Sequence, residues 1–180
     1  ALLSLFFTLS FAQEIKYHLK MPKPQNHYYE VEMELTDFKD AILNVKMPIW
    51  APGSYLAREF AKNVNQVHAF NGAGQELSLK KINKNTWSIT RGNSKKVIVK
   101  YDVYAFELSV RTSFLDLTHG FVSGSGVFMY VENHKEKNGL VEVYPHKEFT
   151  VVTTAMKEEK EAITKDGSRI YSFENYDHLV

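Results

Sequence analysis

Hydrophobic and polar residues alternate along several segments of the chain, which is the two-residue period of a strand with one buried face. In residues 29–35, four apolar side chains alternate with three glutamates. The same period is found in residues 43–47 and 97–105. We expect a β-strand in each of these segments. Pro48 ends the second one, because proline cannot donate a hydrogen bond to a central strand ladder.

Turn signals separate these segments from further candidate strands. Asn71-Gly72 predicts a tight turn between residues 67–70 and 77–79, because both residue types tolerate a positive φ. The other predicted strands are residues 86–90, 127–131, 140–144, 149–154 and 170–173. Residues 54–62 and 156–162 are the two candidate helices. Short strands at this spacing predict an all-β fold, an antiparallel β-sandwich with at most one or two short helices.

The first twelve residues differ from the rest of the chain. Residues 2–9 are mostly apolar, and Ser10 and Ala12 place small side chains before Gln13, as at a signal-peptide cleavage site. This run is too short to span a bilayer, which takes about 20 apolar residues. We expect residues 1–12 to be the remnant of a signal peptide, and the protein to be secreted, periplasmic or on the cell surface. The alternative is a buried N-terminal strand or helix of the mature domain.

The composition favours a single domain and excludes some kinds of chemistry. A chain of 180 residues with 44% hydrophobic residues can bury one sizeable core, so we expect residues 13–180 to form one domain. The formal net charge is +1 and no block of like charges is present, which gives no support for nucleic-acid binding. The sequence has no cysteine, and this excludes disulfides, thiolate metal sites and cysteine nucleophiles.

No local motif for catalysis is present in the sequence. The seven histidines include no His-Glu-x-x-His pattern and no pair four residues apart, so the spacing predicts no metal site. Gly124-Ser125-Gly126 is not a Gly-x-Ser-x-Gly nucleophile elbow and is better explained as a bend or bulge. Walker and Rossmann glycine patterns are also missing. We therefore expect the chain itself to be no enzyme and to hold no cofactor.

Residues 47–60 break the strand pattern. This segment contains two prolines, a glycine and several aromatic side chains, and the charged pair Arg58 and Glu59 lies near its end. The three aromatic residues are Trp50, Tyr55 and Phe60. Such a composition predicts a rigid, shaped loop that presents the charged pair. The alternative is a structural plug, with the aromatic side chains in the core and Arg58 or Glu59 paired inside the domain.

Residues 110–121 form a second irregular segment, inserted between two apolar strands. It contains Arg111, Asp116 and His119. Because Asp116 and His119 are three residues apart, they can share a hydrogen bond within a turn. The alternative is that Asp116 only caps a turn and Arg111 balances its charge.

These two segments carry a resemblance to a known family. Residues 48–60 resemble the Pro-x-Trp-x-Pro-Gly-Ser-Tyr-x-x-Arg-Glu-Phe stretch in the N-terminal domain of M61 peptidases, the glycyl aminopeptidase family. Residues 110–121 are similar to a second block of that domain, and residues 175–180 resemble its run into the catalytic domain. The resemblance extends from about residue 16 to the end of the chain.

The resemblance implies an N-terminal β-sandwich that packs on the catalytic domain of the same polypeptide, a zinc-dependent aminopeptidase that often also carries a PDZ domain. The zinc belongs to that downstream domain, since its His-Glu-x-x-His motif is not in this sequence. In such an arrangement the sandwich closes one side of the substrate cleft. Glu59 or Asp116 would then bind the ammonium group of a peptide substrate's N-terminus through a charge-assisted hydrogen bond. Arg58, Arg111 and His119 would orient these carboxylates or hold the neighbouring domain.

A different class of function is also compatible with the sequence. An autonomous extracellular β-sandwich could bind a carbohydrate or a protein partner through aromatic side chains. The candidate aromatic residues for that function are Tyr28, Tyr29, Trp50 and Trp87.

Overall fold

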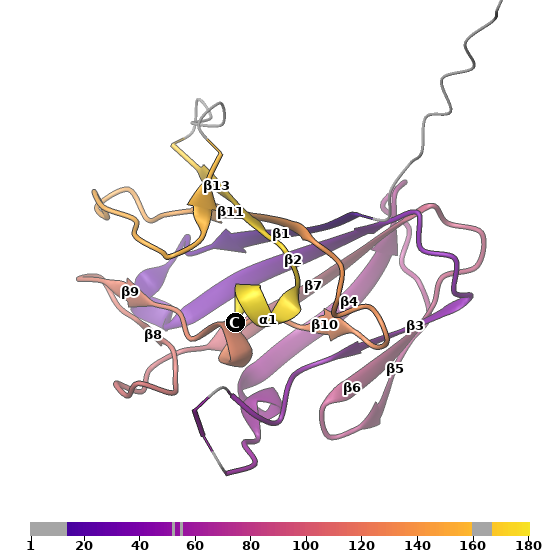
Figure 1. Cartoon of the computed structure of the whole chain (residues 1–180), viewed down its shortest axis with the longest axis horizontal. Helices are drawn as coiled ribbons and strands as arrows, with labels where there is room; N and C mark the ends of the chain where they lie inside the picture. Colours follow the sequence, from indigo (N-terminus) through magenta and orange to yellow (C-terminus); the bar gives the residue numbers. More distant parts are fainter. Residues whose placement is uncertain (1–13, 52, 55, 160–166) are drawn as a thin grey trace, which may run out of the picture.

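The computed structural model describes residues 14–51, 53–54, 56–159 and 167–180 (Figure 1). The predicted signal peptide, residues 1–12, lies outside the described residues, as do Tyr55 and residues 160–162 of the second candidate helix. In the described part of the chain, no helix is long and apolar enough to cross a membrane.

The described strands form three sheets. The seven strands of the largest sheet are β1 (Glu14–Lys20), β2 (Tyr28–Thr36), β4 (Val64–Asn71), β7 (Lys96–Tyr104), β11 (Gly139–Tyr144), β12 (Lys157–Glu158) and β13 (Arg169–Phe173). Their order in space is β12-β13-β11-β1-β2-β7-β4. The second sheet, in the order β10-β3-β6-β5, contains β3 (Ile42–Lys46), β5 (Leu79–Asn83), β6 (Thr86–Thr90) and β10 (Tyr130–Val131). A small third sheet pairs β8 (Phe114–Leu115) with β9 (Gly120–Phe121).

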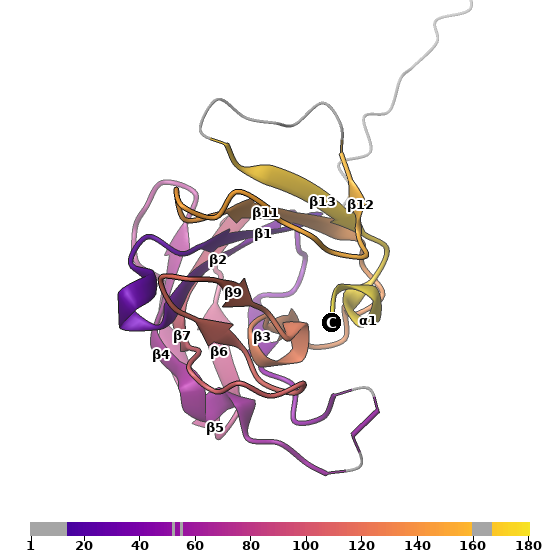
Figure 2. The same ribbon diagram turned by 90° about the vertical axis from the view of Figure 1, so that its left-hand side faces the viewer.

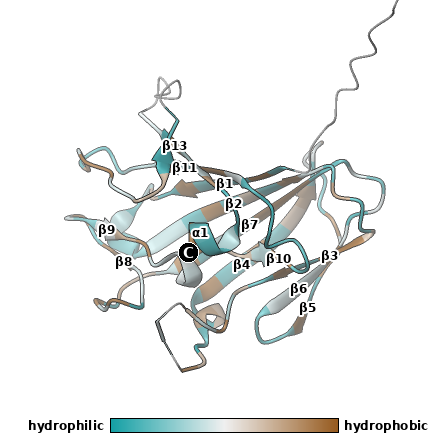
Figure 3. Ribbon diagram, viewed as in Figure 1, coloured by the Kyte–Doolittle hydropathy of each residue, from teal (hydrophilic) through white to brown (hydrophobic). Residues whose placement is uncertain are grey.

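The two larger sheets form the layers of the domain, and its core lies between them (Figure 2). Met33 of β2, Val99 of β7 and Ile89 of β6 are fully buried in one continuous cluster. The polar residues that alternate with them lie on the outer faces, so hydrophilic and hydrophobic positions are mixed along the strands (Figure 3). The predicted all-β sandwich is therefore confirmed, because strand periodicity places one apolar face of each sheet against the other.

Strand β1 was not among the predicted strands, although Ile15, Tyr17 and Leu19 alternate there with polar residues. It pairs antiparallel with β2 on one side and parallel with β11 on the other. All other strand pairs in the described residues are antiparallel. The predicted antiparallel sandwich thus contains one parallel pair, which joins segments more than 100 residues apart.

Buried tyrosines explain why the predicted strand at residues 127–131 is mostly irregular. The Tyr101 hydroxyl donates to the Val127 carbonyl at 3.0 Å and accepts from the Met129 amide at 3.0 Å. The Tyr17 hydroxyl donates to the Met129 carbonyl at 2.5 Å. The Tyr176 hydroxyl donates to the Phe128 carbonyl at 2.6 Å. These side chains satisfy backbone groups that a neighbouring strand would otherwise bind. Only Tyr130–Val131 remains as strand β10.

Several other local predictions were wrong. Residues 149–154 form no strand, and Val151 is exposed. In residues 54–62, only the 3₁₀-helix η2 (Phe60–Asn63) begins, and Lys157–Glu158 of the second candidate helix is a strand paired with β13. The turn after Asn71 is confirmed, because Phe70 and Glu76 form an antiparallel bridge and the Leu77 amide bonds to the Ala69 carbonyl at 2.8 Å. The chain then leaves this sheet, and β5 joins the other one.

Two short helical elements hold the end of the chain. Helix α1 (Tyr176–Leu179) is capped by Asn175, whose side chain accepts a hydrogen bond of 2.9 Å from the amide of His178. The 3₁₀-helix η3 (Gly124–Gly126) replaces the predicted bend or bulge. A side chain at Gly124 would lie 2.8 Å from the Leu179 carbonyl, so α1 can pack closely on η3 only because residue 124 is a glycine.

Candidate functional site

The segment between β3 and η2 is held by its own polar groups as well as by the core. The amide of Arg58 donates to the Ile49 carbonyl at 2.6 Å, and its guanidinium donates to the Ser54 hydroxyl at 3.3 Å. Ser54 and Phe60 are buried, whereas the Trp50 side chain is 55% exposed. The segment is therefore anchored in the domain by Arg58 and Phe60, and it presents Trp50 to solvent.

Glu59 pairs with a lysine at the surface. Its carboxylate accepts a hydrogen bond of 2.9 Å from Lys84, in the turn between β5 and β6. Both side chains are largely exposed. The hydrogen bond and charge of Lys84 lower the pKa of Glu59, so this carboxylate is ionised at neutral pH. A pair this exposed exchanges readily with other charged partners.

Asp116 organises the turn between β8 and β9. One of its carboxylate oxygens accepts hydrogen bonds from the amide and hydroxyl of Thr118, at 2.7 and 2.6 Å, and from the amide of His119 at 3.1 Å. The two hydrogen bonds from Thr118 are the main cause of the lowered pKa of Asp116. The predicted hydrogen bond between Asp116 and His119 is therefore present, and Asp116 caps the turn.

The His119 ring belongs to a row of aromatic side chains. It stacks on Phe114 with ring centroids 4.9 Å apart, and Phe114 stacks on Phe106 at 5.2 Å. His27 packs against Phe106, with ring centroids 3.7 Å apart. Nδ1 of His27 lies 2.7 Å from the Leu115 carbonyl oxygen. The ring of His119 is thus oriented by stacking, while about half of it stays accessible to a partner.

The five predicted residues fall into separate groups. Arg111 lies on an exposed turn, where its amide bonds to the Ser109 hydroxyl at 3.1 Å. Within the described part of the chain, no hydrogen bond or ion pair joins Arg58 or Glu59 to any of the other three candidates. Nor does any ion pair there connect Arg111 to Asp116, so the proposed charge balance between them is not formed.

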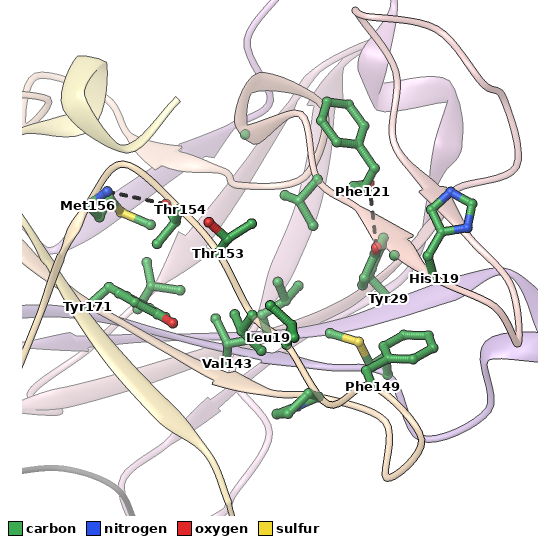
Figure 4. A pocket seen from close by; sticks show the side chains of 18 of the residues that line it. Leu19, Tyr29, His119, Phe121, Val143, Phe149, Thr153, Thr154, Met156 and Tyr171 are labelled. Atoms are coloured by element: carbon green, nitrogen blue, oxygen red, sulfur yellow. Dashed lines mark hydrogen bonds between the residues drawn. The ribbon is translucent and has the colours of Figure 1, made fainter.

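A pocket of about 620 Å³ lies next to the β8–β9 hairpin (Figure 4). His119, Phe121 and Phe149 lie toward one end of the pocket and Met156 and Tyr171 toward the other, with Leu19 of β1 between them (Figure 4). The segment between β11 and β12, residues 145–156, supplies most of the remaining wall. Sequence periodicity missed this pocket because it assigned part of that segment to a strand.

The lining of the pocket favours binding of apolar groups. Its polar atoms include the hydroxyls of Thr153, Thr154 and Tyr171 and the carboxylate of Glu148. His119 is the histidine among the lining residues, and neither serine nor cysteine is among them. Thr118 and His119 are both among the lining residues, and the Thr118 hydroxyl lies 2.9 Å from Nδ1 of His119. The same hydroxyl donates to the Asp116 carboxylate at 2.6 Å, so it is part of the turn that Asp116 organises. The arrangement can bind and orient a partner group.

The pattern of a known domain family matches nearly the whole chain. The model of the peptidase M61 N-terminal domain matches residues 16–180. The chain belongs to this family. The shared region includes both irregular segments and the pocket between the β8–β9 hairpin and residues 145–156.

A solved structure agrees with this M61 assignment. The chain is similar to an aminopeptidase N family protein from Idiomarina loihiensis, with a TM-score of 0.83 and 28% sequence identity. The match covers 92% of this chain and 28% of that one, so this M61 domain corresponds to just over a quarter of the longer protein. No protein of curated function matches the chain.

The structure removes two of the aromatic residues considered for binding by an autonomous sandwich. Trp87 and Tyr29 lie in the core of the M61 domain, with exposed fractions of 3% and 0%. Tyr28 and Trp50 keep accessible rings, and they lie on different segments.

Proposed function

We propose that this M61 domain is a non-catalytic part of a longer zinc-dependent aminopeptidase, in which it packs on the catalytic domain and closes one side of the substrate cleft. The zinc and its His-Glu-x-x-His ligands would belong to that catalytic domain. The share of the Idiomarina loihiensis chain that this domain covers supports a position within a larger enzyme. Export through the N-terminal segment is part of the same proposal.

The distribution of exposed apolar side chains carries this proposal. Twelve large hydrophobic residues are exposed among those that the structure describes; three lie on the segment before η2 and five on the segment that contains β8 and β9. These eight are Ile49, Trp50, Leu56, Phe106, Leu108, Val110, Leu117 and Phe121. Apolar side chains gathered on a few segments indicate a surface that is covered in the functional protein. Both segments also carry the family pattern, which supports the catalytic domain as the partner.

The two carboxylates proposed for the substrate ammonium differ in availability. Glu59 is exposed, and its partner Lys84 is a flexible surface side chain. Asp116 already uses one oxygen for three hydrogen bonds within its own turn. We therefore assign ammonium binding to Glu59, and to Asp116 the shaping of the hairpin that carries His119.

The test uses the longer polypeptide and measures kcat/KM for a peptide with a free N-terminus. Glu59→Ala should reduce kcat/KM by about 10-fold or more, the value of one charge-assisted contact. Asp116→Asn, which keeps the acceptor oxygen of the turn, should have a small effect, whereas Asp116→Ala should disturb the hairpin. Glu76→Ala removes another exposed carboxylate, one that pairs with His68, and serves as control. Unchanged kcat/KM in Glu59→Ala would overturn the assignment.

A further inference from the structure

The outer face of the large sheet holds a histidine between glutamates on both neighbouring strands. His18 on β1 lies opposite Glu32 on β2 and opposite Glu142 on β11 in the strand registers. Glu34 lies two residues further along β2. Side chains opposite one another on adjacent strands are close enough to interact directly. This face is outside the pocket and both irregular segments, so the proposed function does not account for it.

Glu142 fixes the orientation of the His18 ring. Its carboxylate lies 3.3 Å from Nδ1 of His18. It also accepts hydrogen bonds from Lys16 at 2.7 Å and from Ser168 at 2.9 Å. The hydroxyl of Tyr144 also lies 3.4 Å from Nδ1. With Nδ1 facing Glu142 and Tyr144, Nε2 is the ring nitrogen whose lone pair can bind a ligand.

That lone pair has no hydrogen-bond donor. Nε2 of His18 is buried and has no hydrogen-bond partner within the described residues. Oε1 of Glu34, which is also an acceptor, lies 3.6 Å from Nε2. A buried Nε2 that faces a carboxylate oxygen and has no donor is an arrangement that a bound cation would satisfy.

The geometry of these atoms fits a metal ion. Ligand atoms of His18, Glu32 and Glu34 all lie within 4.8 Å of one another. In a tetrahedral zinc site with bonds of about 2.1 Å, ligand atoms are about 3.4 Å apart. The distance of 3.6 Å between His18 and Glu34 is close to this value. The third ligand, Glu32, lies within the same 4.8 Å limit and would move closer on binding the ion.

Lysines on the same face hold the glutamates by their other oxygens. Lys96 binds Oε2 of Glu34 at 2.7 Å, and Lys100 binds Oε2 of Glu32 at 3.1 Å, with Lys20 further away at 4.0 Å. These contacts leave Oε1 of Glu34 directed at His18. The lysines therefore act as outer partners that orient the carboxylates, as Glu142 orients the imidazole.

We propose that His18, Glu32 and Glu34 bind a divalent transition-metal ion, with Glu142 as the positioning residue of the histidine. An imidazole with two carboxylates favours Zn²⁺ and similar ions over Mg²⁺ and Ca²⁺, which prefer ligand sets made of oxygen alone. The ion would join β1 to β2 across the outer face of the sheet. Metal binding here is independent of the proposed packing on a catalytic domain.

The test is titration of the 180-residue chain with Zn²⁺ by calorimetry, followed by thermal unfolding with and without the ion. The chain should bind one Zn²⁺ per molecule, and the ion should raise Tm because it binds the folded state. His18→Ala should weaken binding by at least about 10-fold, and Glu142→Gln by about 10-fold as an outer-shell change. Glu34→Gln preserves the shape of the side chain and should also weaken binding by at least about 10-fold.

His68→Ala is the matched control, because His68 also lies beside a glutamate, Glu76, on an exposed strand position. It should leave Zn²⁺ affinity unchanged. If His18→Ala fails to fold, the Zn²⁺ affinity of Glu34→Gln decides whether the proposal holds. The proposal is overturned if the chain shows no saturable Zn²⁺ binding, if Glu34→Gln binds as tightly as the original, or if Ca²⁺ binds as tightly as Zn²⁺.

Discussion

The hydroxyl of Tyr29, on β2 in the large sheet, donates a hydrogen bond of 2.9 Å to the carbonyl of Phe114 on β8. The same hydroxyl lies 3.4 Å from the carbonyl of Phe121 on β9. Tyr29 is completely buried. A side chain from the large sheet therefore positions both strands of the hairpin that carries Asp116 and His119.

Replacement of Tyr29 by phenylalanine should destabilise the domain. The substitution keeps the ring but leaves the buried Phe114 carbonyl without its donor, at a cost of about 1–2 kcal/mol in the free energy of unfolding. Urea unfolding followed by circular dichroism measures this change. Tyr28→Phe, at the adjacent and more exposed position, is the control and should have almost no effect. Equal losses in the two variants would show that the hydrogen bond to β8 contributes nothing.

Gly120 is required next to the same hydroxyl. A Cβ atom at residue 120 would lie 2.7 Å from Tyr29 Oη and 3.3 Å from a Leu115 methyl group. Because the Tyr29 ring is fixed in the core, Gly120→Ala should cost about 1–3 kcal/mol. In the Tyr29→Phe background the closest contact is gone, so the cost should fall by at least about 0.5 kcal/mol. Strict additivity of the two substitutions in urea unfolding would contradict this account.

The sequence predicted the fold class well because strand periodicity depends on one buried face and needs no knowledge of partners. Residues 29–35 and 97–105 became β2 and most of β7 for this reason. The same reasoning predicted a strand at residues 149–154, and there it was wrong. Their composition suits a strand, but no neighbouring strand pairs with them, and they form a wall of the pocket instead.

The candidate sites could be predicted only where the chemistry is local. Asp116 and His119 are three residues apart, and their hydrogen bond was predicted from that spacing. His18 and Glu32 meet because β1 and β2 pair in one particular register, and Glu142 joins them across a parallel pair 124 residues further along the chain. No spacing within a single segment encodes such a contact. The spacing of the histidines along the sequence therefore predicted no metal site.

The pair formed by Lys46 and Glu132 should make stability depend on pH. Hydrogen bonds from Lys46 at 2.7 Å and from Asn44 at 2.9 Å lower the pKa of Glu132. A lowered pKa means that the unfolded chain binds more protons in acid, so this contribution is present above the unfolded value of about 4.3 and is lost as the pH falls. Because the Glu132 side chain is 37% exposed, the effect should stay below about 1 kcal/mol.

Urea unfolding at pH 7 and pH 3.5 measures this dependence. Glu132→Gln should be less stable than the original chain at pH 7, and this deficit should be smaller at pH 3.5. Glu136→Gln is the control, because Glu136 is exposed and takes part in no ion pair within the described residues. A Glu132→Gln deficit that is the same at both pH values would show that the pair contributes through packing alone.

The exposed tryptophan of the first irregular segment should drive self-association of the isolated domain. Trp50 and Ile82 have nearly equal exposed fractions, 55% and 56%, but Ile82 lies on β5 and belongs to neither of the two segments that carry most of the exposed apolar residues. If a covered surface is built around Trp50, Trp50→Ser should lower the average mass in sedimentation equilibrium and reduce binding of a hydrophobic dye. Ile82→Ser removes a similarly exposed side chain and should change neither measurement. Equal effects of the two substitutions would mean that self-association depends on the total exposed apolar area. The proposed contact of the segment before η2 with a catalytic domain would then have no support from Trp50.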